Sequence, residues 1–133
     1  MINKFIVDEK YYKENDERIL CDFHGTGGLR ILEFSQKNDY VYIGRKNGPA
    51  FIEYHICGNI IAEKWVNHET EHHRINGPAI IRYNYDGTIQ KAIWYHKDNL
   101  YTLAVEDWLK HNKLNWQEMN KEDFDRMWFE VLD

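Results

Sequence analysis

At the centre of the chain stands the segment Arg74-Ile75-Asn76-Gly77-Pro78-Ala79-Ile80-Ile81-Arg82-Tyr83. An earlier segment repeats its pattern 29 residues upstream and reads Arg45-Lys46-Asn47-Gly48-Pro49-Ala50-Phe51-Ile52-Glu53-Tyr54. The same offset pairs Gly58 with Gly87 and Trp65 with Trp94 further along the two copies. A period in this range is typical of proteins built from repeated supersecondary units. The sequence therefore predicts that one structural unit occurs twice.

Each copy has the pattern of a β-hairpin. Glycine and then proline open the first strand, where the missing proline N–H does least harm. Apolar residues then alternate with others, so that Ala79 and Ile81 share one face of the strand. Asp86-Gly87 is a favoured hairpin turn, and the segment 89–95 that follows it is rich in β-branched and aromatic residues. Two such hairpins are expected to lie side by side in one twisted sheet.

A degenerate copy is expected before these two. Residues 28–34 align with residues 48–54 at an offset of 20, through a glycine, several apolar positions and a glutamate. We interpret them as a shortened first repeat whose partner strand is 40–43. At 133 residues the chain fits one domain. Its expected segments are a lead-in (1–22), a degenerate repeat (23–44), two repeats (45–73 and 74–101) and a helical cap (102–133).

The segment 102–133 has the periodicity of helices. Thr102 is placed to cap a first helix, and Asn120 is placed to cap a second. The second helix has apolar residues at i, i+3, i+4, i+7 and i+8, namely Phe124, Met127, Trp128, Val131 and Leu132. We expect the helices to cover the open end or one face of the sheet and to hide a strand edge. The fold class predicted is α+β, with stacked antiparallel β-hairpin repeats in a twisted single sheet, capped by two C-terminal α-helices.

Composition and charge argue against several classes of protein. The net charge of −5 and the lack of a Lys/Arg cluster argue against direct binding of nucleic acid. No apolar run has the length of a signal peptide or of a membrane span, so we expect a cytoplasmic protein without membrane contact. Cys21 and Cys57 lack the spacing of a metal site, and we expect two free thiols. We expect no cofactor.

The repeated unit resembles the MORN-type repeat. It reads Arg-x-Asn-Gly-Pro-Ala-x-Ile-x-Tyr-x-x-x-Gly-x-Ile-x-x-x-x-Trp, which is similar to the variant found in many bacteriophage and large-DNA-virus proteins, where His-Arg often precedes Gly-Pro-Ala. His73-Arg74 fits that lead, whereas the first copy keeps only Arg45. The resemblance covers residues 45–95 well and 24–43 weakly. It implies a stack of hairpins that serves as a binding scaffold, and a phage or viral origin, with the host cytoplasm as the location.

One segment of the chain has residues of the kind that bind metals. His68-Glu69-Thr70-Glu71-His72-His73 contains imidazoles and carboxylates, which divalent transition metals accept as ligands. On this hypothesis the chain is a metal-dependent hydrolase or nuclease, with His68, His72 and His73 as ligands. The alternative is a polar loop between repeats. We favour the loop, because the segment lacks the helical context of His-Glu-x-x-His zinc sites and strand alternation would scatter its side chains.

A repeat sheet without a catalytic constellation offers surface to another protein. We therefore expect a non-catalytic, protein-binding scaffold that is not an enzyme. Its contacts are expected to be aromatic and acidic residues, namely Trp65, Trp94, Tyr85, Tyr101, Glu118, Glu122 and Asp125. Residues 102–133 hold eight acidic and four basic side chains, and such an acidic end suits a basic channel. With the viral resemblance, this predicts an inhibitor of a host defence protein, for example a nucleic-acid-handling enzyme. A homodimer through paired sheet edges is compatible with this prediction.

Overall fold

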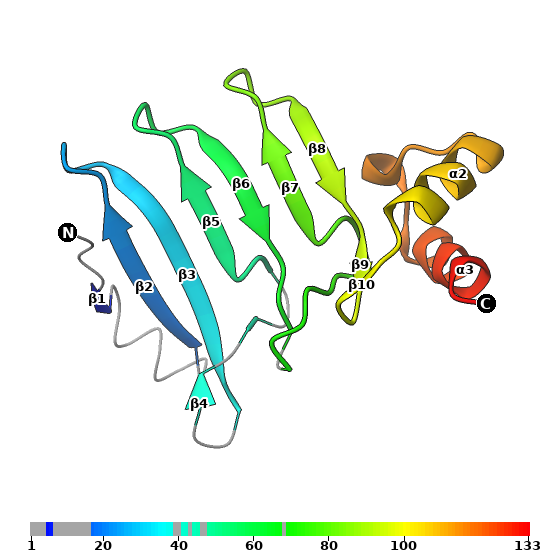
Figure 1. Ribbon diagram of the computed structural model, residues 1–133, viewed down its shortest axis with the longest axis horizontal. Helices are drawn as coiled ribbons and strands as arrows, with labels where there is room; N and C mark the ends of the chain where they lie inside the picture. The colour runs from blue at the N-terminus through cyan, green and yellow to red at the C-terminus, as the bar shows by residue number, and fades with distance from the viewer. Residues whose placement is uncertain (1–4, 7–16, 39–40, 43, 46–47, 68) are drawn as a thin grey trace.

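One antiparallel sheet of consecutive hairpins dominates the molecule. The computed structural model describes residues 5–6, 17–38, 41–42, 44–45, 48–67 and 69–133. The strand order is β1-β2-β3-β5-β6-β7-β8, with β4 paired to β3. A short β9–β10 hairpin and two helices follow, and Figure 1 shows the helices beyond β8, at the end of the row of strands. The predicted α+β class is confirmed, and of the two placements expected for the helices, the end of the sheet is the one observed.

The elements have the following bounds. The strands of the sheet are β1 (Phe5–Ile6), β2 (Glu17–Phe23), β3 (Leu29–Asn38), β4 (Val41–Tyr42), β5 (Phe51–Tyr54), β6 (Ile60–Lys64), β7 (Ile80–Tyr83) and β8 (Ile89–Ile93). The separate hairpin consists of β9 (Tyr95–His96) and β10 (Asn99–Leu100). The helices are α2 (Thr102–Asn112), the short 3-10 helix η1 (Trp116–Glu118) and α3 (Lys121–Val131). Within the described residues, each helix is too short or too polar to cross a membrane.

The two hairpins that follow the Gly-Pro-Ala motifs fold alike. Phe51 pairs with Lys64 across β5 and β6, and Ile80 pairs with Ile93 across β7 and β8, so both strands keep the 29-residue offset. Each hairpin has a register shift at the same place, beside the tyrosine that ends its first strand. Both turns are closed by the same pair of backbone hydrogen bonds. The predicted repeat is therefore confirmed strand by strand.

A third hairpin of this kind lies earlier in the chain than predicted, in β2 and β3. Its turn at residues 24–28 makes the same two backbone hydrogen bonds as the turns at 55–59 and 84–88. The fourth residue of each turn is a glycine with positive φ, which is 100° at Gly27, 98° at Gly58 and 88° at Gly87. Residues that carry a side chain rarely adopt this backbone conformation. Three equivalent glycines therefore mark three equivalent turns.

The alignment of residues 28–34 with the first strand of the later repeats is wrong. Phe34 donates its N–H to the carbonyl of Ala50 over 2.7 Å, as Trp65 donates to the carbonyl of Ala79 over 2.7 Å. Residues 28–34 therefore correspond to a return strand and not to an opening strand. Opening and return strands have the same sequence pattern, because both alternate apolar and polar residues.

A short strand lies within the segment 40–43, but the predicted pairing of this segment with residues 28–34 is wrong. The short strand β4 pairs with the last two residues of β3, Lys37 and Asn38, whereas residues 40 and 43 lie outside the described part of the chain. Along most of its length β3 pairs with β2 on one side, and its middle pairs with β5 on the other. The boundary set between residues 22 and 23 consequently falls inside β2.

The two long helices begin in different ways. Asn120 caps α3 as predicted, because its side chain accepts the N–H of Asp123 at 2.9 Å and the Asp123 carboxylate accepts the N–H of Asn120 at 3.1 Å. The prediction that Thr102 caps α2 is wrong: the N-cap is Tyr101, whose side chain makes no capping bond in the described structure. The Thr102 hydroxyl instead accepts the N–H of Trp94 at 3.0 Å. Thr102 thus ties α2 to the residue that follows β8.

The main apolar core lies between the end of the sheet and the helices. Its buried residues are Trp94, Val105, Trp108, Phe124, Met127 and Trp128. Trp94 is the one member that comes from the repeats, and the rest belong to α2 and α3. The helices therefore pack around a single tryptophan of the last hairpin, and this packing fixes α3 beside the Asn-Gly-Pro-Ala loop described next.

Candidate binding surface

In each repeat an arginine ties the Asn-Gly-Pro-Ala loop to the preceding hairpin. Arg74 donates to the carbonyl of Pro78 over 3.2 Å, and its guanidinium carbon lies 3.9 Å from the ring centre of Trp65. Arg45 has the same two distances in the first copy, with Phe34 as its ring. A guanidinium stacked on an aromatic ring gains cation–π attraction in addition to its hydrogen bond. The same arginine contact therefore joins successive units of the sheet.

The glycine of each loop makes room for this arginine. A Cβ at Gly77 would lie 2.7 Å from the guanidinium carbon of Arg74, and a Cβ at Gly48 would lie 2.8 Å from Nη1 of Arg45. Any side chain at these positions would push the guanidinium away from its ring and its carbonyl. The motif is therefore a structural site for the chain's own arginine.

The helices take the place of a further repeat. The ring of Trp94 packs against Trp116 and Trp128, with ring centres 6.0 and 6.1 Å away, where an earlier unit would have an arginine. The N–H of Trp94 donates to the hydroxyl of Thr102, where the earlier units have an alanine carbonyl as acceptor. The carbonyl of Trp94 accepts the N–H of Tyr101 at 2.8 Å. The backbone groups of Trp94 are thus satisfied without another strand.

One loop of the repeat is built into the helical cap and carries an exposed apolar residue. The indole N–H of Trp128 in α3 donates to the carbonyl of Ile75 over 2.6 Å. The side chains of Ile75, Phe129 and Leu132 are 43%, 79% and 40% exposed, and they line one hollow together with Asp125. We call Ile75, Asp125, Phe129 and Leu132 the cap surface.

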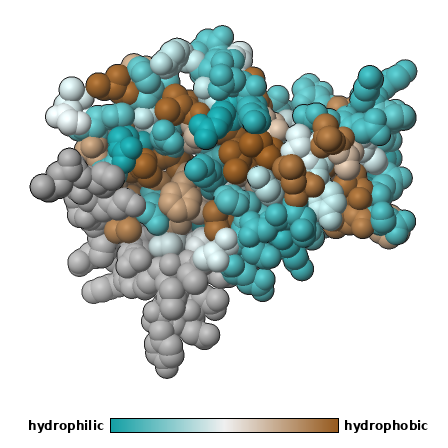
Figure 2. Space-filling view, in the orientation of Figure 1, coloured by the Kyte–Doolittle hydropathy of each residue, from teal (hydrophilic) through white to brown (hydrophobic). Residues whose placement is uncertain are grey.

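The cap surface continues on the other side of the loop. Ile75 and Asp125 also border a second hollow of about 540 Å³, whose wall includes Trp116 and Met119 from the segment around η1. In the orientation of Figure 2, apolar side chains gather both on the cap and over the middle of the sheet, with polar side chains between them. The cap thus combines apolar and acidic groups around the Ile75 loop.

The contact residues predicted from the sequence are scattered over the molecule. Trp94 is 1% exposed and lies inside the core, and half-buried Trp65 lies under the guanidinium of Arg74. Tyr101 is half-buried, whereas Tyr85 is exposed at a hairpin turn. The acidic residues Glu118, Glu122 and Asp125 are all exposed on η1 and α3. Of the predicted contacts, Asp125 is the one that belongs to the cap surface.

The sequence patterns do not predict two residues of the cap surface, Ile75 and Phe129. Ile75 occupies the variable position of the repeat motif, which is Lys46 in the first copy, and an apolar side chain in a polar loop was the available signal. Phe129 lies outside the apolar stripe of the second helix, so nothing in that stripe pointed to it. Leu132 was placed on the buried stripe, but it is 40% exposed.

His72 and His73 form a docking point for the β9–β10 hairpin. The carboxylate of Asp98 accepts the backbone N–H of His72 over 2.6 Å, and Nδ1 of His73 accepts the backbone N–H of Lys97 over 3.0 Å. Among the described residues, which do not include His68, no group of three or more His, Cys, Asp or Glu side chains could hold a metal ion. The two histidines thus join the segment between the repeats to the β9–β10 hairpin.

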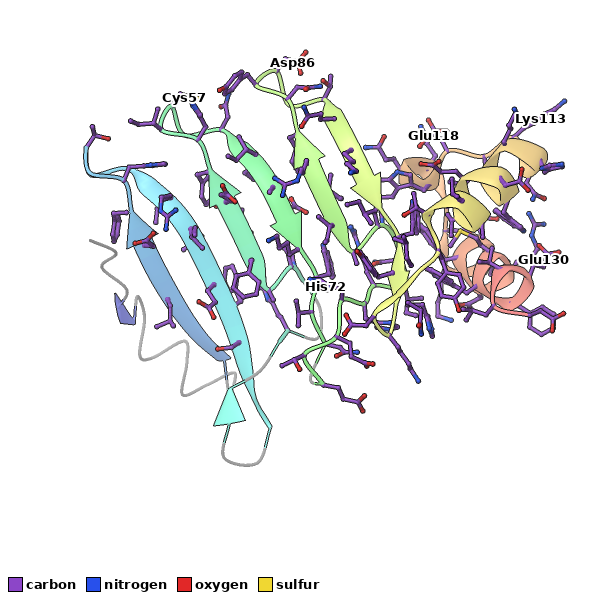
Figure 3. The ribbon with its side chains drawn as sticks, in the orientation of Figure 1. Cys57, His72, Asp86, Lys113, Glu118 and Glu130 are labelled. Carbon is purple, nitrogen blue, oxygen red and sulfur yellow. The ribbon has the colours of Figure 1, made fainter. Side chains whose placement is uncertain are left out.

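The hairpin turns carry another small group of side chains. Cys57 is exposed, and its sulfur lies 3.0 Å from Nδ1 of His55, whose ring meets that of Tyr85 edge-on at 4.6 Å. Cys57 and the buried Cys21 are both free. Figure 3 shows Cys57 at the edge of the sheet that holds the turns and His72 at the opposite edge. These groups therefore do not share one site.

Burial shifts the pKa of histidines and tyrosines along the sheet. Burial lowers the pKa of His73 and that of His96, whose rings meet at 4.7 Å. Burial and the Glu63 carboxylate raise the pKa of Tyr54, and burial with the charge and hydrogen bonding of Glu63 raises that of Tyr83 to about 12. Both tyrosines are therefore neutral near pH 7.

Comparisons of the chain with protein-family models, with curated proteins and with solved structures gave no match. The resemblance to MORN-type repeats and the viral origin that it implies therefore stay predictions. Function must be inferred from the surface of the chain itself.

Proposed function

We propose that the chain is a non-catalytic scaffold that binds another protein through the cap surface. The observation that supports this proposal is the exposure of three large apolar side chains, Ile75, Phe129 and Leu132, around one hollow. Single exposed apolar residues are ordinary on protein surfaces. A group of them beside charged residues is typical of interaction sites.

The cap surface is pre-organised for binding. Trp128 holds the carbonyl of Ile75, and within the same loop Nε of Arg74 donates to the side chain of Asn76 over 3.1 Å. The capping box and the buried side chains of α3 fix the other half of the surface. A surface that is ordered before binding loses little conformational entropy when a partner arrives. The repeat sheet and the helical core therefore act as the support for a contact site.

The partner in this proposal is a host protein. The MORN-type resemblance implies a phage or viral origin, and a small acidic protein can occupy the basic channel of a nucleic-acid-handling enzyme. Exposed Glu118, Glu122 and Asp125 give the cap the charge that such a channel attracts. Inhibition of a defence enzyme would follow from occupation of its channel.

Affinity capture with variants of the cap surface tests the proposal. The tagged chain and its Ile75→Asp and Phe129→Asp variants are incubated with host-cell extract at low salt, and bound proteins are quantified. We expect the unmodified chain to retain a stoichiometric partner and both variants to lose it. Leu103→Asp is the matched control, because Leu103 is 83% exposed on α2 but lies outside the cap surface. Absence of a stoichiometric partner, or equal loss with Leu103→Asp, would refute the proposal.

A further inference from the structure

We infer that the partner presents a basic amphipathic helix, which packs along one exposed stripe of α3. This inference rests on the proposed function and specifies the chemistry of its partner. The stripe consists of Glu122, Asp125, Phe129 and Leu132, which are spaced by three, four and three residues. Residues at this spacing lie along one side of a helix. All four are exposed, and Leu132 continues the helical backbone as the C-cap of α3.

The stripe changes its chemistry along the helix. Its first half carries the carboxylates of Glu122 and Asp125, and its second half carries the apolar side chains of Phe129 and Leu132. The buried face of the same helix is formed by Phe124, Met127 and Trp128. Helix α3 therefore uses one face to close the core and displays another with an acidic end and an apolar end.

The geometry of α3 selects a helix as the matching element. The backbone N–H and C=O groups of a helix are bonded within it, so α3 offers no edge to which a strand could be added. Contact must come from side chains, along a stripe about 15 Å long. A partner helix presents side chains at the same spacing and can pack its ridges into the grooves of α3.

The charges on the stripe select a basic partner. Asp125 is already paired with Lys121, whose Nζ lies 2.8 Å from Oδ2. Both side chains are exposed, so this pair contributes little to stability. A lysine or arginine of the partner can therefore take the place of Lys121 or bind Glu122. The partner helix should carry apolar residues opposite Phe129 and basic residues one to two turns away.

A second copy of this chain does not fit the stripe. In an antiparallel pair of α3 helices, each Asp125 would face Phe129 of the other copy, and the carboxylate would lose water without gaining a cation. In a parallel pair the two Asp125 carboxylates would face each other and repel. The acidic half also opposes attachment to anionic lipid. A homodimer through sheet edges is a separate prediction that this argument does not address.

Designed peptides test the inference on the whole chain. The probe is a helical peptide of about 18 residues with leucine and lysine along one stripe, and its twin has glutamate in place of each lysine. Binding is followed by NMR titration of the isotope-labelled chain. We expect the basic peptide to shift the backbone signals of α3 and of Ile75, and the acidic twin to bind at least about tenfold more weakly. Phe129→Ala should weaken binding by about tenfold or more, whereas Leu103→Ala should leave it unchanged.

The outcomes separate this inference from the proposed function. No binding of the basic peptide, equal binding of the acidic twin, or signal shifts confined to the sheet would overturn the inference. If affinity capture still yields a partner that depends on Phe129, the scaffold proposal stands without the helix. Sedimentation of the chain alone provides a second check, because a dimer that Phe129→Ala dissociates would assign the stripe to a second copy.

Discussion

Replacement of Thr102 by valine should lower the free energy of unfolding by about 1–3 kcal/mol. The Thr102 hydroxyl accepts the N–H of Trp94 at 3.0 Å, and Trp94 is 1% exposed. Valine has nearly the shape of threonine but no acceptor, so the buried N–H would lose its partner. A buried donor without a partner costs about 1–3 kcal/mol. Valine and threonine have similar helix propensities, so the change should isolate the hydrogen bond.

Urea unfolding followed by tryptophan fluorescence measures this loss. We expect a lower midpoint with an unchanged m-value, since the same surface is exposed on unfolding. Faster hydrogen exchange at the Trp94 amide would locate the effect. Thr102→Ser keeps the hydroxyl, so its loss of stability should be less than half of the loss in Thr102→Val. A loss below about 0.5 kcal/mol for valine, or an equal loss for serine, would refute the idea that this hydroxyl replaces a strand.

Two further predictions concern the repeats and their junction with the cap. Gly77→Ala should cost about 1–3 kcal/mol in urea unfolding, because its Cβ would displace the guanidinium of Arg74. Gly28→Ala is the control, since its nearest described neighbour is 4.0 Å away, and an equal cost there would contradict this reasoning. Folding lowers the pKa of His73 and His96, so the unfolded chain binds protons first as the pH falls. The free energy of unfolding should therefore decrease as the pH drops below about 6.5. Each of the two histidines contributes at most about 1.4 kcal/mol to this decrease per pH unit. His96→Phe should flatten this slope between about pH 7 and 5.5, and an unchanged slope would contradict the assignment.

The central hairpins were predictable because their sequence signals are local and repeated. Asn-Gly-Pro-Ala, the turn glycine and the closing tryptophan recur at one fixed offset. The glycine of the first motif makes room for the arginine, and the turn glycine adopts a positive φ. The first hairpin does not share this offset, because its connection to the next unit is longer. From Phe34 to Arg45 the chain runs two residues further than from Trp65 to Arg74, so the period breaks there.

The cap surface was not predictable because it depends on contacts between distant residues. Trp128 and Ile75 are 53 residues apart, and their hydrogen bond helps to place an apolar loop residue beside α3. The histidines between the repeats show the same limit. The partners of His73 and His72 in the β9–β10 hairpin lie 24 and 26 residues away, so these contacts could not be predicted from the local sequence.

The place where the repeats stop is also the place where a binding surface can arise. A further repeat would have covered Trp94 with an arginine and its backbone with a strand. In this chain Trp116 and Trp128 cover the ring instead, and Trp128 belongs to the buried face of α3. The other face of α3 is left for display, beside the Ile75 loop of the last unit. Because the cap contacts that last unit through Trp94 and the loop, added or removed hairpins at the far end of the sheet would leave this surface unchanged. The number of repeats and the choice of partner can therefore vary independently.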